Sequence, residues 1–290
     1  MRNPVTTGSG TFGFGSEVRD LVPLDRLGAV TVKATTREPR LGNPPLRIAE
    51  TASGILNAIG LQNGGIVDYL ANKAPYLRQF DVPIIVNVPG ENPEDFAYVV
   101  AQLTAAGAAD AVELNISCPN VSNGLDYGSD PKLAAAVVAA VKAVTHLPVI
   151  AKLSPNVTDI RPIAQACEDA GADALSVINT VIGTAIDPRK RVFRLANITG
   201  GLSGPAIKPI ALLAVYRCYG VVTIPIIGMG GIASAMDAVE FMLAGATAVA
   251  VGTGNFVDPT LSLTVIDGIE SYCEASGFSR VADLVGAINS

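Results

Sequence analysis

Short apolar runs rich in β-branched residues alternate with longer amphipathic, alanine-rich runs along this chain of 290 residues. The apolar runs predict strands at residues 4–9, 29–35, 83–88, 111–117, 148–154, 174–179, 223–229 and 246–252. The amphipathic runs predict helices at residues 17–27, 66–80, 93–106, 131–145, 159–170, 209–219 and 233–244. Such alternation is typical of parallel strands joined by right-handed crossovers. The sequence therefore predicts an α/β fold, a closed (β/α)8 TIM barrel in preference to an open doubly wound sheet.

Two connections are longer than a barrel requires, at residues 36–65 and 180–208. Both follow predicted strands, so we expect them to form hairpin or loop insertions at the C-terminal face of the barrel. The first contains "GNPPLR", which is too rich in proline for a helix and favours small hairpins or extended cover. We find no linker or low-complexity tract, so residues 1–290 are expected to form a single domain.

Composition narrows the class of protein. Hydrophobic residues make up 49% of the chain and charged residues 16%, which is compatible with a large core. A net charge of −6 disfavours a nucleic-acid partner, including a role as a tRNA-modifying barrel. The sequence has no apolar run long enough for a signal core or a bilayer span, so we expect a cytoplasmic protein without a membrane partner. The four cysteines show no CxxC spacing, which argues against a metal or iron–sulfur site held by this chain alone.

Polar residues collect where the predicted apolar strands end. Lys33, Asn87, Asn115, Lys152 and Asn179 close five of them. Burying an unpaired amide or ammonium costs several kcal/mol, on the order of 2–7 for an amide, so these groups are expected to face a polar ligand. The alternative for the lysines is a salt bridge inside the barrel mouth, for which Glu113 is the main available acid.

Glycine-rich turns follow the seventh and eighth predicted strands, in "IIGMGGI" and "AVAVGTG". Glycines allow backbone N–H groups to converge on a phosphate, and barrels often bind phosphate at this position. The alternative is that these glycines serve tight turns only. A phosphate ligand that also requires Lys152 suggests a flavin, because a cation there would offset the charge of a ring that accepts a hydride.

Six motifs lie in an order and spacing that resemble one family. "NAIGLQN", "NISCPN", "AKLSPN", "VINT", "GGLSGPAIKP" and "GMGGI" are similar to the FMN-dependent dihydroorotate dehydrogenases of pyrimidine biosynthesis. The resemblance implies that FMN is the cofactor, with contacts from Ser9, Lys33, Ala34, Asn87, Asn115, Lys152, Ile178, Gly204, Gly230, Gly231, Gly252 and Thr253. It implies a substrate site formed by Lys33, Asn57, Gly60, Leu61, Asn115, Asn179 and Thr180. Asparagines suit dihydroorotate because each offers both a donor and an acceptor to its amide and imide edges.

The same resemblance assigns Cys118, in "NISCPN", as the catalytic base. Oxidation of dihydroorotate requires a proton taken from carbon 5 and a hydride passed from carbon 6 to the flavin, so the base must lie on the opposite face of the substrate ring. A free thiol has a pKa of about 8.5, so a modest lowering makes thiolate available near neutral pH. The alternative, a buried structural cysteine, is the usual fate of this residue type. Cys167, Cys218 and Cys273 lie in helix-like segments and are expected to be structural.

Among the branches of the family, the cysteine base resembles class 1, and "NAIGLQN", "AKLSPN" and "GGLSGPAIKP" resemble its NAD-linked subtype. That subtype implies a homodimer, joined into a heterotetramer by a partner subunit that carries FAD and a [2Fe–2S] cluster and passes electrons to NAD⁺. Three alternatives remain open at this point: the fumarate-linked class 1 enzyme, a flavin barrel like dihydropyrimidine dehydrogenase, and a non-enzymatic flavin-binding barrel.

Overall fold

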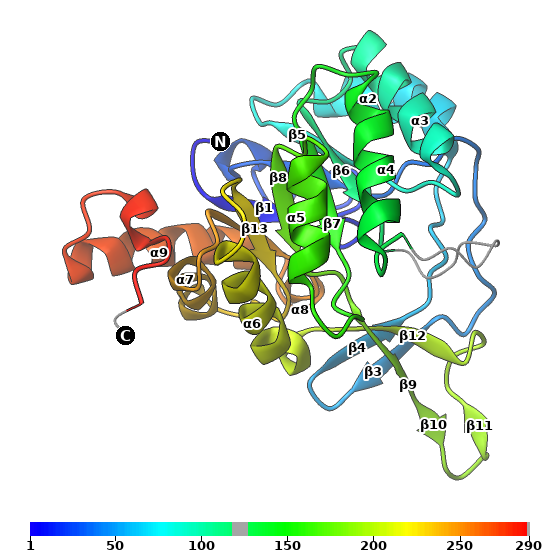
Figure 1. Ribbon diagram of the computed structural model, residues 1–290. Coiled ribbons are helices and arrows are strands. Elements are labelled where there is room, and N and C mark those ends of the chain that lie inside the picture. Colours follow the sequence, from blue (N-terminus) through cyan, green and yellow to red (C-terminus); the bar gives the residue numbers. More distant parts are fainter. Residues whose placement is uncertain (118–126, 289–290) are drawn as a thin grey trace.

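The computed structural model describes residues 1–117 and 127–288, and eight parallel strands form its central barrel (Figure 1). In spatial order these strands are β1 (Val5–Thr7), β14 (Ala248–Val251), β13 (Ile226–Met229), β8 (Ala174–Val177), β7 (Val149–Leu153), β6 (Ala111–Asn115), β5 (Ile84–Val88) and β2 (Val30–Val32). Each lies within one of the eight predicted strand ranges, so the predicted barrel is confirmed.

The edge strands β1 and β2 are joined largely through threonine side chains. Thr7 Oγ1 donates to the Thr31 carbonyl at 3.1 Å and accepts from the Thr31 N–H at 3.0 Å. The Thr6 and Thr31 hydroxyls lie 3.0 Å apart, and the Gly28 N–H donates to the Val5 carbonyl at 2.9 Å. These bonds satisfy strand-edge groups that would otherwise lie unpaired inside the barrel.

Strand residues alternate between two cores with a period of two, as the pleat requires. One core fills the barrel and consists of Ala29, Ile85, Ile150, Ile227, Met229, Ala248 and Ala250. The other lies between the strands and the helices, and it takes the intervening residues, such as Ile84 and Val86 of β5. Asn87 has the same parity as the inward Ile85, and Lys152 the same parity as the inward Ile150. The polar residues of these strands are therefore directed into the barrel.

Five of the predicted helices cover the outside of the barrel close to their expected bounds (Figure 1). They are α3 (Pro93–Ala105), α4 (Pro131–Lys142), α5 (Arg161–Asp169), α6 (Lys208–Tyr219) and α7 (Ala235–Leu243). Asn92 caps α3 by accepting from the Asp95 N–H at 2.9 Å, and Ser234 caps α7 in the same way through Asp237. The predicted helix at 66–80 is present as α1 (Gly65–Asp68), a π-helical turn at Tyr69–Lys73 and α2 (Ala74–Leu77).

The predicted helix at 17–27 is wrong. Only a 3₁₀ turn at Leu24–Arg26 forms there, because Pro23 lacks an N–H and cannot continue a helix through the segment. Two helices near the C-terminus, α8 (Gly254–Val257) and α9 (Leu261–Ser276), were not predicted. Helix α9 buries Leu261, Val265 and Ile269 against the barrel and α7. These apolar residues recur every four positions, a helical spacing from which the sequence could have predicted α9.

The two long connections combine into one antiparallel sheet over the C-terminal end of the barrel. Strands β3 (Ile48–Thr51) and β4 (Gly54–Asn57) form the predicted hairpin of the first insertion. From the second insertion, β9 (Val181–Thr184) and β12 (Thr199–Ser203) complete the order β3-β4-β12-β9. A small hairpin of β10 (Ile186–Asp187) and β11 (Val192–Phe193) projects beyond it (Figure 1). After β12, a 3₁₀ turn at Pro205–Ile207 leads into α6.

Within residues 1–117 and 127–288, we find no helix that combines the length and the apolar character needed to cross a bilayer.

Candidate active site

A cavity of about 570 Å³ lies between the C-terminal ends of the barrel strands and the antiparallel sheet. All predicted cofactor and substrate contacts in the described part of the chain line this one cavity. They are Ser9, Lys33, Ala34, Asn57, Gly60, Leu61, Asn87, Asn115, Lys152, Ile178, Asn179, Thr180, Gly204, Gly230, Gly231, Gly252 and Thr253. The predicted base, Cys118, lies outside the described residues, although the preceding residue, Ser117, lines the cavity. The structure thus brings the predicted residues together, while their individual roles stay predictions.

A buried charged cluster forms one side of the cavity. Lys152, near the end of β7, lies 3.6 Å from the Glu113 carboxylate of β6 and donates to Ser9 Oγ at 3.3 Å. Glu113 also accepts from Asn87 Nδ2 at 2.6 Å and from Ser176 Oγ at 2.7 Å. A salt bridge with Glu113 is the alternative role predicted for Lys152 from the sequence, and the structure shows this ion pair. Lys152 lines the cavity nevertheless, so the ammonium has both a buried acid and an open side facing the ligand space.

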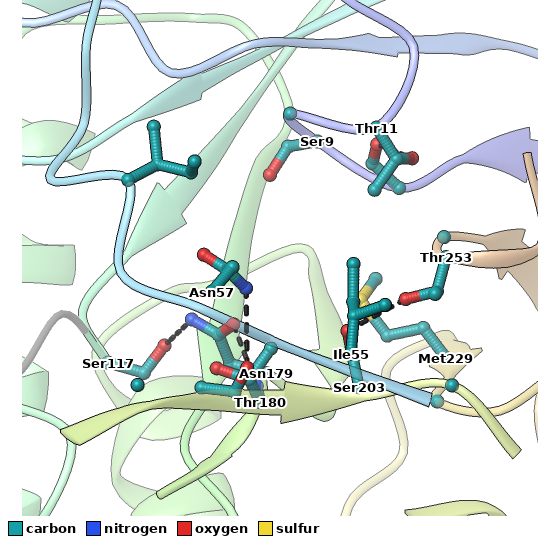
Figure 2. Close-up of a pocket in the computed structure, with 18 of the residues that line it drawn as sticks. Ser9, Thr11, Ile55, Asn57, Ser117, Asn179, Thr180, Ser203, Met229 and Thr253 are labelled. Carbon is teal, nitrogen blue, oxygen red and sulfur yellow. Dashed lines mark hydrogen bonds between the residues drawn. The ribbon is translucent and has the colours of Figure 1, made fainter. Parts of the chain in front are cut away.

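A second group of side chains gathers three amides and a hydroxyl (Figure 2). Asn179 Nδ2 donates to Ser117 Oγ at 2.6 Å and to Asn115 Oδ1 at 3.2 Å. From the antiparallel sheet, where β4 pairs with β12, Asn57 joins this group, and its Nδ2 donates to the Gly201 carbonyl at 3.4 Å. Since every amide retains further donor or acceptor capacity, the group can pair with several polar edges of a small planar ring.

Two further cations, Lys33 and Arg47, line the cavity. Burial, with a smaller contribution from the nearby Arg47 guanidinium, lowers the pKa of Lys33 from 10.5, opposed only in part by Glu17. Arg47 donates to Gln62 Oε1 at 2.6 Å and to the Asn43 carbonyl at 3.2 Å. In the described residues, neither cation forms an ion pair with a carboxylate within 4.0 Å. The part of the cavity that these two cations line is therefore suited to an anionic ligand.

The glycine-rich turns form the opposite side of the cavity from backbone. Gly204, Gly230 and Gly231 have positive φ values of 96°, 130° and 80°. A Cβ at Gly231 would lie 2.9 Å from the Gly204 carbonyl oxygen, so close packing within the protein also requires this glycine. Gly252 is different, because its φ is not in the left-handed region and a Cβ there would meet no protein atom within 4 Å. The space beside Gly252 belongs to the cavity.

These features fit FMN, which the resemblance implies. The turns supply backbone N–H groups and free volume for a phosphate, joined by the Thr253 hydroxyl, which is 2.8 Å from Ser203 Oγ. Asn87 lines the cavity, and its Oδ1 is fully buried without a hydrogen-bond partner among the described residues. Such an orphaned acceptor is costly unless a ligand N–H satisfies it.

Several cavity residues were missed by reasoning from the sequence. Arg47 and Ser203 lie in the two insertions, whose pairing brings them to the cavity from distant parts of the chain. Asn156 holds the start of β9 in place, since its side chain donates to the Thr180 carbonyl at 3.1 Å and accepts from the Ile182 N–H at 2.9 Å. Ser117, Asn156 and Ser203 each had a signal, since they lie within the quoted motifs "NISCPN", "AKLSPN" and "GGLSGPAIKP".

Comparison with known proteins agrees with this geometry. A family model described as dihydroorotate dehydrogenase matches residues 1–273. A protein of Pelobacter propionicus, called dihydroorotate dehydrogenase B (NAD(+)), catalytic subunit, is 53% identical over 289 residues, covering 99% of this chain and 95% of that protein. Proteins with the same name from Desulforamulus reducens and Bacillus pumilus are 54% identical over 288 residues and 52% over 287, covering 99% of this chain and 95% and 93% of theirs. The chain therefore belongs to the dihydroorotate dehydrogenase family, as its motifs predict.

Proposed function

We propose that this chain is the catalytic subunit of an NAD-linked dihydroorotate dehydrogenase, which oxidises dihydroorotate to orotate in pyrimidine biosynthesis. One observation carries the proposal: a single cavity joins a glycine-built cradle to a buried lysine and a group of asparagines. The relatives named as the B (NAD(+)) type, at 51–54% identity, support the same reaction and favour this subtype over the fumarate-linked one.

FMN is proposed to lie across this cavity, with its phosphate at Gly204, Gly230, Gly231, Gly252 and Thr253 and its ring at Lys152, Asn87 and Ile178. When bound, FMN would supply the acceptor for the hydride that leaves carbon 6 of dihydroorotate. Lys152 contributes a fixed positive charge on the ring side. Asn87 supplies an acceptor that is unsatisfied among the described residues.

Dihydroorotate is proposed to lie between FMN and the amide group. Asn57, Asn115 and Asn179 would pair with its amide and imide edges, which fixes the orientation of carbons 5 and 6. Its carboxylate is the anion that would be attracted by Lys33 and Arg47, which line the same cavity. An uncharged dihydropyrimidine lacks this carboxylate, so the two cations also select against it.

Cys118 is proposed to remove the proton from carbon 5. Burial raises the pKa of Cys167 and of Cys218 to about 12, so neither thiol supplies thiolate near neutral pH. The one histidine of the sequence, His146, is exposed in the connection between α4 and β7. This connection precedes β7, whereas the cavity lies at the C-terminal end of that strand, so His146 is not placed to act as the base. Ser117 donates to Asn115 Oδ1 at 3.1 Å, so the residue directly before Cys118 in the sequence is hydrogen-bonded to the group of amides that is proposed to bind the substrate.

The name "catalytic subunit" of the relatives supports a second polypeptide in the assembly. We propose that this partner carries FAD and a [2Fe–2S] cluster and reduces NAD⁺, and that two copies of this chain form the centre of a heterotetramer. On this proposal NAD⁺ does not bind the present chain.

The proposal is tested with purified, FMN-loaded protein in a steady-state assay. Dihydroorotate is expected to drive reduction of an artificial dye, and dihydrouracil in its place is expected to give no dye reduction. When NAD⁺ replaces the dye as the acceptor, dihydroorotate is expected to give no NADH. Turnover of dihydrouracil at the dihydroorotate rate would favour the dihydropyrimidine dehydrogenase alternative. Efficient NAD⁺ reduction by this chain alone would contradict the assignment of a partner, and fumarate reduction would contradict the NAD-linked subtype.

A further inference from the structure

We propose that Glu113 is a positioning residue that sets the reduction potential of the flavin by offsetting the charge of Lys152. This inference rests on the proposed binding of FMN. Glu113 lies in the middle of β6 and does not itself line the cavity, so it can act on a ligand only through the residues in front of it.

The carboxylate of Glu113 is held by groups from three other strands of the barrel. Asn87 Nδ2 of β5 donates to Oε1 at 2.6 Å, Ser176 Oγ of β8 donates to Oε2 at 2.7 Å, and Lys152 Nζ of β7 lies 3.6 Å from Oε1. The exposed fractions of these residues are 2% for Glu113, 6% for Lys152 and 0% for Asn87 and Ser176. An anion that is this deeply buried and this fully paired cannot turn away to water.

The register of the strands places the acid directly behind the cavity wall. Asn87 is paired with Glu113 across β5 and β6, and Lys152 with Ser176 across β7 and β8. All four side chains point into the barrel, where residues from alternate strands stack in layers. Lys152 and Asn87 line the cavity while Glu113 and Ser176 do not. Glu113 is thus separated from the ligand space by the two groups to which it is bonded.

A buried negative charge at this distance reduces the positive potential that Lys152 presents to the ring. Solvent and salt screen buried charges weakly, so the offset acts at close to its full strength. Reduction adds negative charge to a flavin, and a less positive surrounding makes the reduced form less favourable. Glu113 should therefore lower the reduction potential from the value that Lys152 alone would give.

The test uses FMN-loaded Glu113→Gln, which keeps an acceptor for Asn87 and removes the charge. Its midpoint potential, measured by anaerobic equilibration with a redox dye, should rise by at least about 30 mV, which is a tenfold change in the equilibrium for a two-electron couple. Sulfite, an anion that adds to oxidised flavins, should bind at least tenfold more tightly. Glu113→Asp keeps the negative charge but moves it away from Lys152. It should therefore raise the midpoint potential and the sulfite affinity, each by less than Glu113→Gln does.

The comparison with a Lys152→Met background separates an electrostatic role from a structural one. In that background the buried carboxylate of Glu113 has lost its counter-ion, and such a group takes up a proton rather than remaining an isolated buried charge. Glu113→Gln then removes no charge, so it should change the potential and the sulfite affinity by less than twofold in equilibrium terms. An unchanged potential in folded, FMN-loaded Glu113→Gln and Glu113→Asp would overturn the inference. So would a shift that persists in full without Lys152. Wild-type protein that binds no FMN would overturn the proposed function as well, which distinguishes the two failures.

Discussion

The two sides of the cavity are built in different ways. The side formed by β4 and by the ends of β5 to β8 presents charged and amide side chains, and it contains the buried pair of Lys152 and Glu113. The side formed by the turns after β12, β13 and β14 presents backbone, and at Gly252 it leaves space that the protein does not fill. In Figure 2 the group at Asn57, Asn179 and Ser117 lies apart from the group at Ser203, Met229 and Thr253.

This difference suggests that the side chains of the first side act on the substrate, while the backbone turns of the second side bind the cofactor. Side chains can hold charge, orient a substrate and move a proton, so changes on the first side should alter the rate of flavin reduction or the affinity for substrate. Backbone N–H groups and free volume can hold a phosphate but cannot titrate, so changes on the second side should alter FMN affinity. Four variants test this division, in order of decreasing effect.

Cys118→Ala should slow flavin reduction by dihydroorotate near neutral pH by about 10²–10⁴-fold, the usual contribution of a general base. FMN content should stay unchanged, because Cys118 is proposed to act on the substrate and is not among the proposed FMN contacts. Stopped-flow absorbance of the FMN-loaded variant measures the rate. An unchanged rate would remove Cys118 from the mechanism.

Lys33→Met should weaken orotate binding by about 10–100-fold, since a hydrogen bond to a charged group contributes about 1.5–3 kcal/mol. The lowered pKa of Lys33 also predicts that wild-type affinity for orotate begins to fall at a pH below the ordinary value of 10.5, as the ammonium loses its proton. Titrations of both proteins across that range measure the effect. A pH profile that is the same in Lys33→Met would contradict the role of this ammonium.

The same lowered pKa has a consequence for stability. A lysine whose folded pKa lies below its unfolded value destabilises the fold most at pH values below the folded pKa, and the penalty is relieved as the pH rises toward 10.5. Lys33→Met should therefore raise the free energy of unfolding at neutral pH while it weakens substrate binding. Chemical denaturation without ligand measures this.

Gly252→Ala should weaken FMN binding by about 5–30-fold, which corresponds to about 1–2 kcal/mol for an extra methyl group in a filled site. Dihydroorotate should still reduce the fraction that retains FMN at the wild-type rate. The matched control is Gly220→Ala at the end of α6, where a Cβ would make only ordinary contacts, at 3.7 Å or more. Equal FMN affinity in the two variants would mean that the space beside Gly252 is not used by the cofactor.

Cys167→Ser should leave the rate of flavin reduction within about twofold, since burial raises the pKa of this thiol to about 12 and its helix faces away from the cavity. The free energy of unfolding should fall by about 1–3 kcal/mol, because the new hydroxyl replaces a buried sulfur in an apolar core. A large loss of rate here would show that the effect of Cys118→Ala is not specific to its position.

The sequence predicted the barrel well because each strand carries its own signal. The runs around Ile85, Ile150 and Ile227 are apolar on both faces, and glycine or proline marks their ends. The segment at 17–27 failed because its apolar spacing resembles a helix while Pro23 prevents one. Helix α9 was missed although its buried residues recur every four positions.

The site was predicted from motifs, and its supporting contacts could not be. Lys152 and Asn179 close apolar strands, which is a local signal. The pairing of Asn57 with Gly201 depends on two insertions meeting over the barrel, and the position of Arg47 depends on the hairpin beside it. Such long-range contacts are fixed by the folded arrangement and have no local pattern. The partners of Glu113 belong to this class too, since they come from three different strands.

The proposed reaction requires one cavity to hold FMN and dihydroorotate close enough for direct reduction. Anaerobic titration of the purified, FMN-loaded chain with dihydroorotate, followed by the visible absorbance of the flavin, measures this. We expect the absorbance to bleach as substrate is added, with formation of orotate in proportion to the FMN reduced. Protein that holds FMN in full yet shows no bleaching at saturating dihydroorotate would contradict it.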